Sequence, residues 1–277
     1  MKLILITLIS LFSSCSHLFY FPDRVYWFDP AKLKIEKEEI YFESTDKTKL
    51  YAWHLKRHKK FQKSKGLIIQ FHGNAQNLTS HWPTLGWLTK EGYDVFVFDY
   101  RGYGISEGQA NQQGLYKDAL AALDFAYALK EKLKAEKFIV YAQSLGGNVC
   151  ARAIVDFKLK QNVDLLVLES TFDSYQGIAA HKLLQSKIFA IFWPLTPFVV
   201  SNEYASIYHL HKIKMPTLVI HGKKDNVVPH FYGKKIYDQI GSQKKWFWDI
   251  DEAAHLNLYY IEKNKYRDKF LSLIANI

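Results

Sequence analysis

Three side chains in this sequence could together carry out nucleophilic catalysis at a carbonyl carbon: Ser144, Asp225 and His255. Acyl transfer by serine needs a hydroxyl nucleophile, a histidine that takes its proton and a carboxylate that orients the histidine. Each residue also has an ordinary interpretation, since serine is a favoured helix N-cap, aspartate is frequent in turns, and a lone histidine can lie at the surface. All three follow directly after predicted strands, in the order serine, aspartate, histidine, and this favours catalysis.

Ser144 lies between a predicted strand and a predicted helix in FIVYAQSLGGNVCARAI, which runs from Phe138 to Ile154. A sharp strand–turn–helix elbow would expose the hydroxyl and direct the next backbone N–H, that of Leu145, at the substrate. Such an elbow needs small residues two positions before and two positions after the serine, and Ala142 and Gly146 occupy them. Alanine in place of the usual glycine makes the motif weaker when it is taken alone.

Asp225 follows the predicted strand TLVIHG in the loop KKDNVVP, and His255 follows the predicted strand KKWFWDID in the loop EAAHLN. Parallel strands present their carboxyl ends at one edge of a sheet, so we expect both loops to lie near Ser144. Four other carboxylates are alternative acids, three of them near the histidine in sequence and one at the end of another predicted strand: Asp249, Asp251, Glu252 and Glu169.

The stretch FHGNAQN follows the predicted strand GLIIQ and could supply a backbone donor for an oxyanion. A His-Gly turn at this point lets an N–H group face the nucleophile, and we expect Asn74 to be the donor, with Ala75 as the alternative. We expect His72 to hydrogen-bond to the loop backbone rather than to act as a second base. The turn DYRGYGISEG (Asp99–Gly108) lacks the pattern of a phosphate-binding loop and is expected to shape a wall of the site.

The elements around these motifs indicate an α/β sheet with helices on both faces. EEIYFES and KLYAWHLK alternate apolar and polar residues and predict an antiparallel hairpin near the N-terminus. The nearly continuous apolar runs predict buried parallel strands: GLIIQFHG, YDVFVFDYRG, KFIVYAQS, DLLVLEST and TLVIHGKKD, with KKWFWDID as a possible last strand. The predicted helices span residues 78–90, 115–133, 145–157 and 232–240, with one more near the C-terminus.

The stretch from Phe172 to Met215 interrupts this alternation and is broken by Pro194 and Pro197. Long insertions at the carboxyl end of a strand are often functional, so residues 172–215 are interpreted as a cap or wall over the site. The alternative is a set of extra helices that pad the edge of the sheet. Its apolar side chains would form a wall that favours acyl chains over charged peptides: Ile188, Phe189, Ile191, Phe192, Trp193, Phe198 and Val199.

Composition sets wider bounds on the function. The 277 residues, 48% of them hydrophobic, are compatible with a single α/β domain. The formal net charge of +10 suits anionic surfaces, but the sequence has no nucleic-acid-binding motif, so we expect no nucleic-acid partner. The two cysteines, Cys15 and Cys150, do not make a disulfide framework, and Cys150 is expected to be buried as a small hydrophobic residue.

The N-terminal stretch MKLILITLISLFSSCSH predicts a targeting segment. Its apolar run is shorter than the roughly 20 residues that cross a bilayer, and its basic start and small final residues fit a secretory signal. The stretch also resembles a bacterial lipobox, in which Cys15 would be acylated and become the first residue of the mature protein. Residues 1–14 would then be a signal peptide, and the protein would be exported and anchored to a membrane, in the outer membrane or elsewhere in the cell envelope. An ordinary cleaved signal and an uncleaved anchor extended by HLFYF are the alternatives.

Together these motifs resemble the α/β-hydrolase superfamily, and more closely the Bem46-like, serine-aminopeptidase-like hydrolases. The resemblance is carried by YFP, FHGNAQN, DYRGYGISEG, YAQSLGG, PTLVIHGKKDNVVP and AAHLNLY, which extend from about Tyr20 to the C-terminus. It implies an α/β-hydrolase fold in a single domain, residues 15–277. The sequence departs from the family pattern at Ala142 and at the acidic pair Asp251–Glu252, where relatives often have glycine before the histidine.

The resemblance also implies roles for individual residues. Ser144 would be the nucleophile, Asp225 the acid and His255 the base, while Leu145 and Asn74 would supply backbone donors, without a cofactor or metal. Members of the superfamily have been assigned as esterases, thioesterases, lipases and peptidases, so the substrate stays open. We expect hydrolysis of an ester or thioester in a small or lipid-like acyl substrate at a membrane surface. A serine peptidase or aminopeptidase-like activity and a non-catalytic binding protein are the alternatives.

Overall fold

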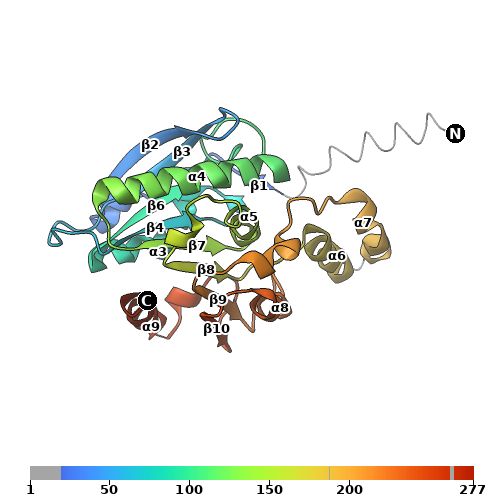
Figure 1. Ribbon diagram of the computed structural model, residues 1–277. Coiled ribbons are helices and arrows are strands. Elements are labelled where there is room, and N and C mark those ends of the chain that lie inside the picture. The colour runs from blue at the N-terminus through green and yellow to red at the C-terminus, as the bar shows by residue number, and fades with distance from the viewer. Residues whose placement is uncertain (1–19, 187, 263–264) are drawn as a thin grey trace.

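The structure, a computed structural model, describes residues 20–186, 188–262 and 265–277, so Cys15 and the predicted signal peptide lie outside the described residues. A central sheet of eight strands has the order β10-β9-β8-β7-β4-β6-β3-β2 (Figure 1). Its strands in chain order are β2 (Lys37–Glu43), β3 (Lys49–Leu55), β4 (Gly66–Phe71), β6 (Tyr93–Phe98), β7 (Phe138–Gln143), β8 (Leu165–Glu169), β9 (Thr217–Gly222) and β10 (Lys245–Ile250). A separate pair of short strands joins β1 (Phe21–Pro22) to β5 (Ala75–Gln76).

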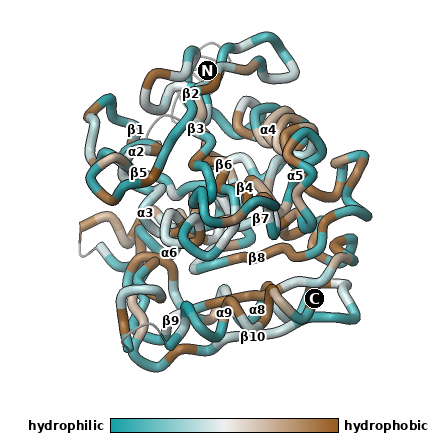
Figure 2. Tube along the Cα trace, turned by 90° about the vertical axis from the view of Figure 1, so that its left-hand side faces the viewer, coloured by the Kyte–Doolittle hydropathy of each residue, from teal (hydrophilic) through white to brown (hydrophobic). Residues whose placement is uncertain are grey.

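The strands from β10 to β6 pair in parallel, whereas β3 pairs antiparallel with both β2 and β6. The predicted mostly parallel sheet with an N-terminal antiparallel hairpin is therefore confirmed. Seen at right angles to the first view, the strands follow one another from β2 near the top to β10 at the bottom (Figure 2). The carboxyl ends of the parallel strands meet at one edge, which is where the predicted site residues lie.

Helices cover both faces of the sheet. One face is covered by α4 (Gln112–Leu133), α5 (Leu145–Ala153) and α8 (Phe231–Gln239). The other face is covered by α2 (Leu78–His81), α3 (Pro83–Gly86), the 3₁₀ helices η3 (Trp87–Glu91) and η8 (Leu258–Tyr260), and α9 (Lys265–Ala275). The single helix predicted over residues 78–90 is thus wrong in detail, because Pro83 starts a new helix and has no N–H to donate to the turn before it.

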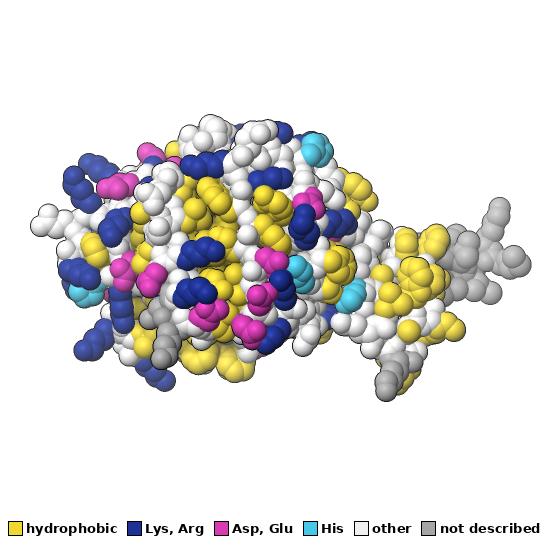
Figure 3. All heavy atoms as spheres, turned by 90° about the horizontal axis from the view of Figure 1, so that it is seen from below, with side chains coloured by type: hydrophobic (Ala, Val, Ile, Leu, Met, Phe, Trp, Pro, Cys, Tyr) yellow, Lys and Arg dark blue, Asp and Glu magenta, His cyan; other side chains and the backbone are white. Residues whose placement is uncertain are grey.

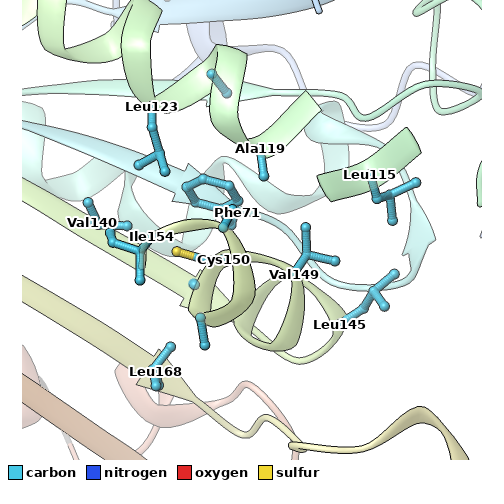
Figure 4. Close-up of a cluster of buried hydrophobic side chains, with 14 of the residues drawn as sticks. Phe71, Leu115, Ala119, Leu123, Val140, Leu145, Val149, Cys150, Ile154 and Leu168 are labelled. Carbon is cyan, nitrogen blue, oxygen red and sulfur yellow. The ribbon is translucent and has the colours of Figure 1, made fainter. Parts of the chain in front are cut away.

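The central strands are buried along their whole length, and their side chains alternate between two cores. Phe71, Val140 and Leu168 point to the core under α4 and α5, together with Cys150 (Figure 4). The Cys150 thiol is fully buried and burial raises its pKa, so the prediction of a small hydrophobic residue is confirmed.

The predicted insertion forms a lobe and two further short helices. The lobe contains α6 (Tyr175–Gln185), η5 (Ala190–Leu195) and α7 (Thr196–Val199), and it is followed by η6 (Ser206–Tyr208) and η7 (Leu210–Lys212). In Figure 1, α6 and α7 stand beside the sheet rather than on one of its faces. Most of the apolar side chains proposed to line the site face outward instead, among them Ile191 at 79% and Phe198 at 86% exposure. The interpretation of residues 172–215 as a cap or wall over the site stays a prediction.

Candidate active site

Ser144 lies at the joint between β7 and α5 with φ 52° and ψ −121°. A positive φ is uncommon outside glycine, and such backbone strain clusters at functional sites. The Ser144 side chain caps no N–H group of α5, so it does not act as an ordinary N-cap. The turn is held by the Ser144 N–H, which donates to the Glu169 carbonyl (2.9 Å), and by the Thr171 hydroxyl, which donates to the Ser144 carbonyl (2.6 Å).

The small residues on either side of Ser144 have a steric reason. A Cβ atom at Gly146 would lie 2.5 Å from the His72 carbonyl oxygen and 2.6 Å from that of Phe71, so a side chain cannot be accommodated without a shift of backbone. Ala142 is fully buried and pairs with Phe71 in the register of β4 and β7. A methyl group is therefore accommodated at position 142, and the departure from glycine leaves the elbow intact.

The structure brings the three predicted residues into one hydrogen-bonded chain. His255 Nδ1 lies 2.8 Å from Asp225 Oδ2, and His255 Nε2 lies 3.1 Å from Ser144 Oγ. Because a carboxylate oxygen only accepts, Nδ1 carries the proton and Nε2 is left to accept the serine hydroxyl. The other carboxylate oxygen, Oδ1, accepts the N–H groups of Val227 (2.9 Å) and Val228 (2.8 Å), which fix the plane of the acid.

His221 is a further neighbour of Asp225 that the sequence did not reveal. Its Nε2 lies 3.5 Å from Asp225 Oδ2 and 2.9 Å from the Val228 carbonyl oxygen, so this nitrogen carries a proton. Burial alone would raise the pKa of Asp225, but the hydrogen bonds from His221 and His255 outweigh it and hold that pKa far below its ordinary value. The acid is therefore ionised throughout the neutral range.

The alternative acids have other partners. The three carboxylates near His255 in sequence each pair with a basic side chain: Asp249 with His230, Asp251 with Lys223, and Glu252 with Lys224. Glu169 is buried, and it accepts hydrogen bonds from the Tyr141 hydroxyl (2.9 Å) and from Gln143 Nε2 (2.8 Å). Burial raises the pKa of Glu169 despite these bonds. The geometry favours Asp225 as the partner of His255.

The predicted oxyanion loop lies beside Ser144. A Cβ atom at Gly73 would be 3.6 Å from the Ser144 Cβ, which places the next residue, Asn74, at the edge of the site. The Tyr103 hydroxyl lies 2.8 Å from the carbonyl oxygen and 2.9 Å from the Oδ1 of Asn74, and it donates to this residue. Directly after Ser144, Leu145 begins α5, and the first N–H groups of a helix have no hydrogen-bond partner within that helix. These two backbone segments can serve a developing oxyanion.

His72 and the glycine-rich turn occupy the positions expected of them. His72 is fully buried, and its Nδ1 lies 2.7 Å from the Gly73 carbonyl oxygen, so the predicted bond to loop backbone is confirmed. Tyr103 extends from the turn Asp99–Gly108 to Asn74, which makes this turn a wall of the loop. Gly104 in the turn has φ +53°, and a Cβ atom there would lie 2.1 Å from Asp99 Oδ2.

The residues that follow Tyr20 brace the oxyanion loop from outside, a contact that the sequence did not reveal. β1 pairs in parallel with β5, directly after Asn74. The Asp23 carbonyl accepts the N–H of Gly104 (3.0 Å), and its Oδ1 accepts Asn77 Nδ2 (2.6 Å). The start of the described chain therefore connects the turn Asp99–Gly108 to the predicted oxyanion loop. Only the short YFP stretch could have signalled it.

Two absences apply to the parts of the chain that the structure describes. Within residues 20–186, 188–262 and 265–277, no group of three or more His, Cys, Asp or Glu side chains is arranged to hold a metal ion. Over the same ranges, no helix has both the length and the apolar character needed to cross a membrane.

Comparison with known protein families gives two matches. A family model described as "alpha/beta hydrolase fold" matches residues 66–197, a range that contains Ser144 and the oxyanion loop. A second model, "Serine hydrolase (FSH1)", matches residues 152–251, a range that contains Asp225.

Individual relatives extend these matches over most of the chain. The α/β-hydrolase domain-containing protein WAV2 of Arabidopsis thaliana is 34% identical over 245 residues, 85% of this chain and 78% of WAV2. Protein bem46 of Schizosaccharomyces pombe is 28% identical over 82% of this chain and 73% of its own length. The lysophosphatidylserine lipase ABHD12 of Danio rerio is 31% identical over 67% of this chain, which spans half of that enzyme.

A solved structure has the same fold. The esterase Pf2001 of Pyrococcus furiosus superimposes with a TM-score of 0.71 at 20% identity, over 93% of this chain and 97% of the esterase. At this level of identity, the likeness concerns the fold alone.

Proposed function

The chain belongs to the α/β-hydrolase family as a Bem46-like serine hydrolase, and we propose that it cleaves carboxylic esters through an acyl-enzyme formed on Ser144. The observation that carries this proposal is the hydrogen-bonded chain from Ser144 through His255 to Asp225, set on a strained strand–helix turn. An ordinary N-cap serine needs neither the strained backbone of Ser144 nor its connection through His255 to Asp225.

In the acylation step, Ser144 Oγ attacks the ester carbonyl carbon while His255 Nε2 takes the hydroxyl proton. Asp225 stabilises the imidazolium that results, and the backbone N–H groups of Leu145 and Asn74 stabilise the negative charge on the carbonyl oxygen. Collapse of the tetrahedral intermediate breaks the ester C–O bond, and His255 donates its proton to the departing alcohol. Water then attacks the acyl-enzyme with His255 again as the base, which releases the acid and restores Ser144.

The substrate that we propose is a lipid-like acyl ester. Two findings support it: the lobe that follows β8 exposes large apolar side chains at the edge of the sheet where Ser144 lies, and a relative of the chain is a lysophosphatidylserine lipase. Each buried methylene contributes up to about 0.8 kcal/mol. Specificity should therefore rise by about 3- to 4-fold per acyl carbon until the acyl site is full.

We propose in addition that the protein is exported and tethered to a cell-envelope membrane through an acylated Cys15, as the N-terminal sequence predicts. Intact-mass measurement of the protein from a bacterial membrane should show acylation at Cys15, and Cys15→Ser should leave an unprocessed precursor. A soluble, unacylated mature form of the wild type would contradict the tether and indicate an ordinary signal.

The substrate proposal is tested with kcat/KM for p-nitrophenyl esters from acetate to dodecanoate in wild type, with Ser144→Ala as the control for hydrolysis that does not depend on the site. We expect kcat/KM to rise with chain length in wild type and to be lost at every chain length in Ser144→Ala. A flat profile in wild type, or strong cleavage of amino-terminal peptides, would reject the acyl-ester substrate in favour of a peptidase.

A further inference from the structure

The lobe formed by residues 174–186 and 188–202, called here the apolar lobe, exposes an unusual amount of large apolar surface. Six of its side chains, with exposed fractions between 47% and 86%, illustrate this: Ile188, Phe189, Ile191, Phe192, Trp193 and Phe198. Figure 3 shows hydrophobic side chains gathered on this lobe, whereas the body in the same view carries interspersed acidic and basic side chains. Monomeric soluble proteins rarely expose contiguous apolar patches of this kind, which mark binding surfaces.

We propose that the apolar lobe docks into the interfacial region of an anionic lipid bilayer. Its composition fits this partner, because residues 174–202 contain no aspartate or glutamate, and their charged residues are Lys182 and Lys187. Aromatic and aliphatic side chains enter the boundary between head groups and acyl chains, while lysine is attracted to anionic head groups. The longest helix of the lobe, α6 (Tyr175–Gln185), is shorter than the roughly 20 residues that cross a bilayer, so this contact lies on the surface of the bilayer.

The attachment of the lobe to the body places such a bilayer near the nucleophile. The lobe begins just after β8, the strand next to β7, whose carboxyl end carries Ser144. Both ends of the insertion are held there, since the Ser206 N–H donates to Asn148 Oδ1 of α5 (2.8 Å) and the Ile207 N–H donates to the Asp173 carbonyl (3.0 Å). A lobe docked in lipid would therefore hold the edge of the sheet that bears the site toward the membrane.

The start of the described chain lies on the same side. Tyr20 is buried in one cluster with Tyr175, the first residue of α6. Cys15 precedes Tyr20 by five residues, and a fully extended chain would hold the two within about 18 Å. An acyl anchor on Cys15 and the apolar lobe could thus enter one bilayer together. The inference rests on the proposed function in one respect, namely that the same bilayer would also contain the ester substrate.

The test uses the full chain in a Cys15→Ser background, with an environment-sensitive NBD fluorophore attached to a single introduced cysteine. One variant carries it in the lobe, Phe198→Cys, and the matched control carries it at another exposed aromatic position, Tyr41→Cys on β2. Cys150 is fully buried and stays unlabelled. Both proteins are mixed with phosphatidylcholine vesicles that contain or lack phosphatidylglycerol, and each is also concentrated without lipid.

We expect the emission at position 198 to shift to the blue and to rise several-fold with phosphatidylglycerol vesicles, while position 41 stays unchanged. Exchange of Ile191 for serine in the Phe198→Cys protein should weaken vesicle binding by about tenfold. An unchanged signal at position 198, or equal changes at both positions, would overturn the proposal. A shift on concentration without lipid would instead assign the surface to a second copy of the chain and would also overturn it.

The same proteins separate this inference from the proposed function. Adding Ser144→Ala to the labelled chain removes the proposed nucleophile without altering the lobe, so vesicle docking should persist. Docking without any esterase activity in the wild type would leave the lobe inference standing and reject the catalytic proposal. Esterase activity without docking would reject the lobe inference and leave the catalytic proposal standing.

Discussion

The carboxylate of Asp225 accepts four hydrogen-bonding contacts, from two backbone N–H groups and two histidines, and only the contact with His255 leads to Ser144. We therefore expect Asp225→Asn to fold but to hold His255 in the wrong tautomer, which lowers kcat by up to about 10⁴-fold. The measurement is kcat on a short p-nitrophenyl ester, with circular dichroism to verify folding. Asp249→Asn is the control, because Asp249 pairs with His230. A full rate in Asp225→Asn would transfer the role to another acid.

The low pKa of Asp225 also predicts how stability depends on pH. Burial raises this pKa, and the bonds from His221 and His255 lower it further than burial raises it, so the folded pKa lies below that of the unfolded chain. Such a group stabilises the fold above the unfolded pKa of about 3.9 and loses this contribution as pH falls toward the folded pKa.

Chemical unfolding of wild type and Asp225→Asn at pH 6 and pH 3 tests this sign. Wild type should lose more free energy of unfolding than Asp225→Asn between the two values, since asparagine does not titrate. An equal loss in the two proteins would show that Asp225 has an ordinary pKa in the folded state.

At the scale of elements, the residues after Tyr20 position the site from outside the main sheet. Asp23 bonds Gly104 in one wall of the site and Asn77 at the end of the stretch FHGNAQN that forms the predicted oxyanion loop. Asp23→Ala should remove the side-chain half of this brace and lower kcat by about 10- to 100-fold, because small displacements of catalytic donors are costly. KM for a short ester should change much less.

The control for this prediction is Asp29→Ala in the same segment. Asp29 caps the short helix η2 (Pro30–Leu33) by accepting the Ala31 N–H at 3.0 Å, so its loss should lower stability by about 1 kcal/mol without lowering kcat. If both substitutions lower kcat equally, or neither does, Asp23 has only a structural role.

Elements with strong periodicity were predictable, while their interruptions and long-range partners were not. Continuous apolar runs identified each parallel strand, and the hairpin at β2 and β3 followed from alternation. The prediction of one helix over residues 78–90 was wrong because Pro83 divides this stretch. His54 lies in β3, as the predicted strand KLYAWHLK implies, but its bond to Asp94 (2.8 Å), a partner 40 residues away, follows from no local pattern.

The same distinction holds in the site. Ser144, Asp225 and His255 could be placed from sequence because each follows a strand, and parallel strands end at one edge. His221 and Tyr103 could not, since their significance lies in contacts with Asp225 and Asn74 that no local pattern encodes. The outward orientation of the side chains at residues 188–198 was equally hidden, because apolar composition alone does not separate a wall of the site from an exposed surface.

On the scale of the whole molecule, a net charge of +10 and an acid-free apolar lobe predict salt-sensitive attraction to anionic membranes. Binding of the Cys15→Ser chain to phosphatidylglycerol vesicles should weaken as salt rises from about 0.05 M to 0.5 M, because screening shortens the range of the attraction. Cosedimentation at each salt concentration measures the fraction of protein bound to vesicles. The apolar contribution should remain at high salt, so complete release there would mean that charge alone drives the contact.

If Ser144 is an activated nucleophile, a fluorophosphonate probe should label it covalently, and intact-mass measurement detects the adduct. We expect one covalent adduct on wild type, mapped to Ser144, and none on folded Ser144→Ala. Ser272→Ala, which changes an exposed serine on α9, should label like wild type. An unlabelled wild type, or a folded Ser144→Ala protein that labels at the wild-type rate, would show that Ser144 is not the nucleophile.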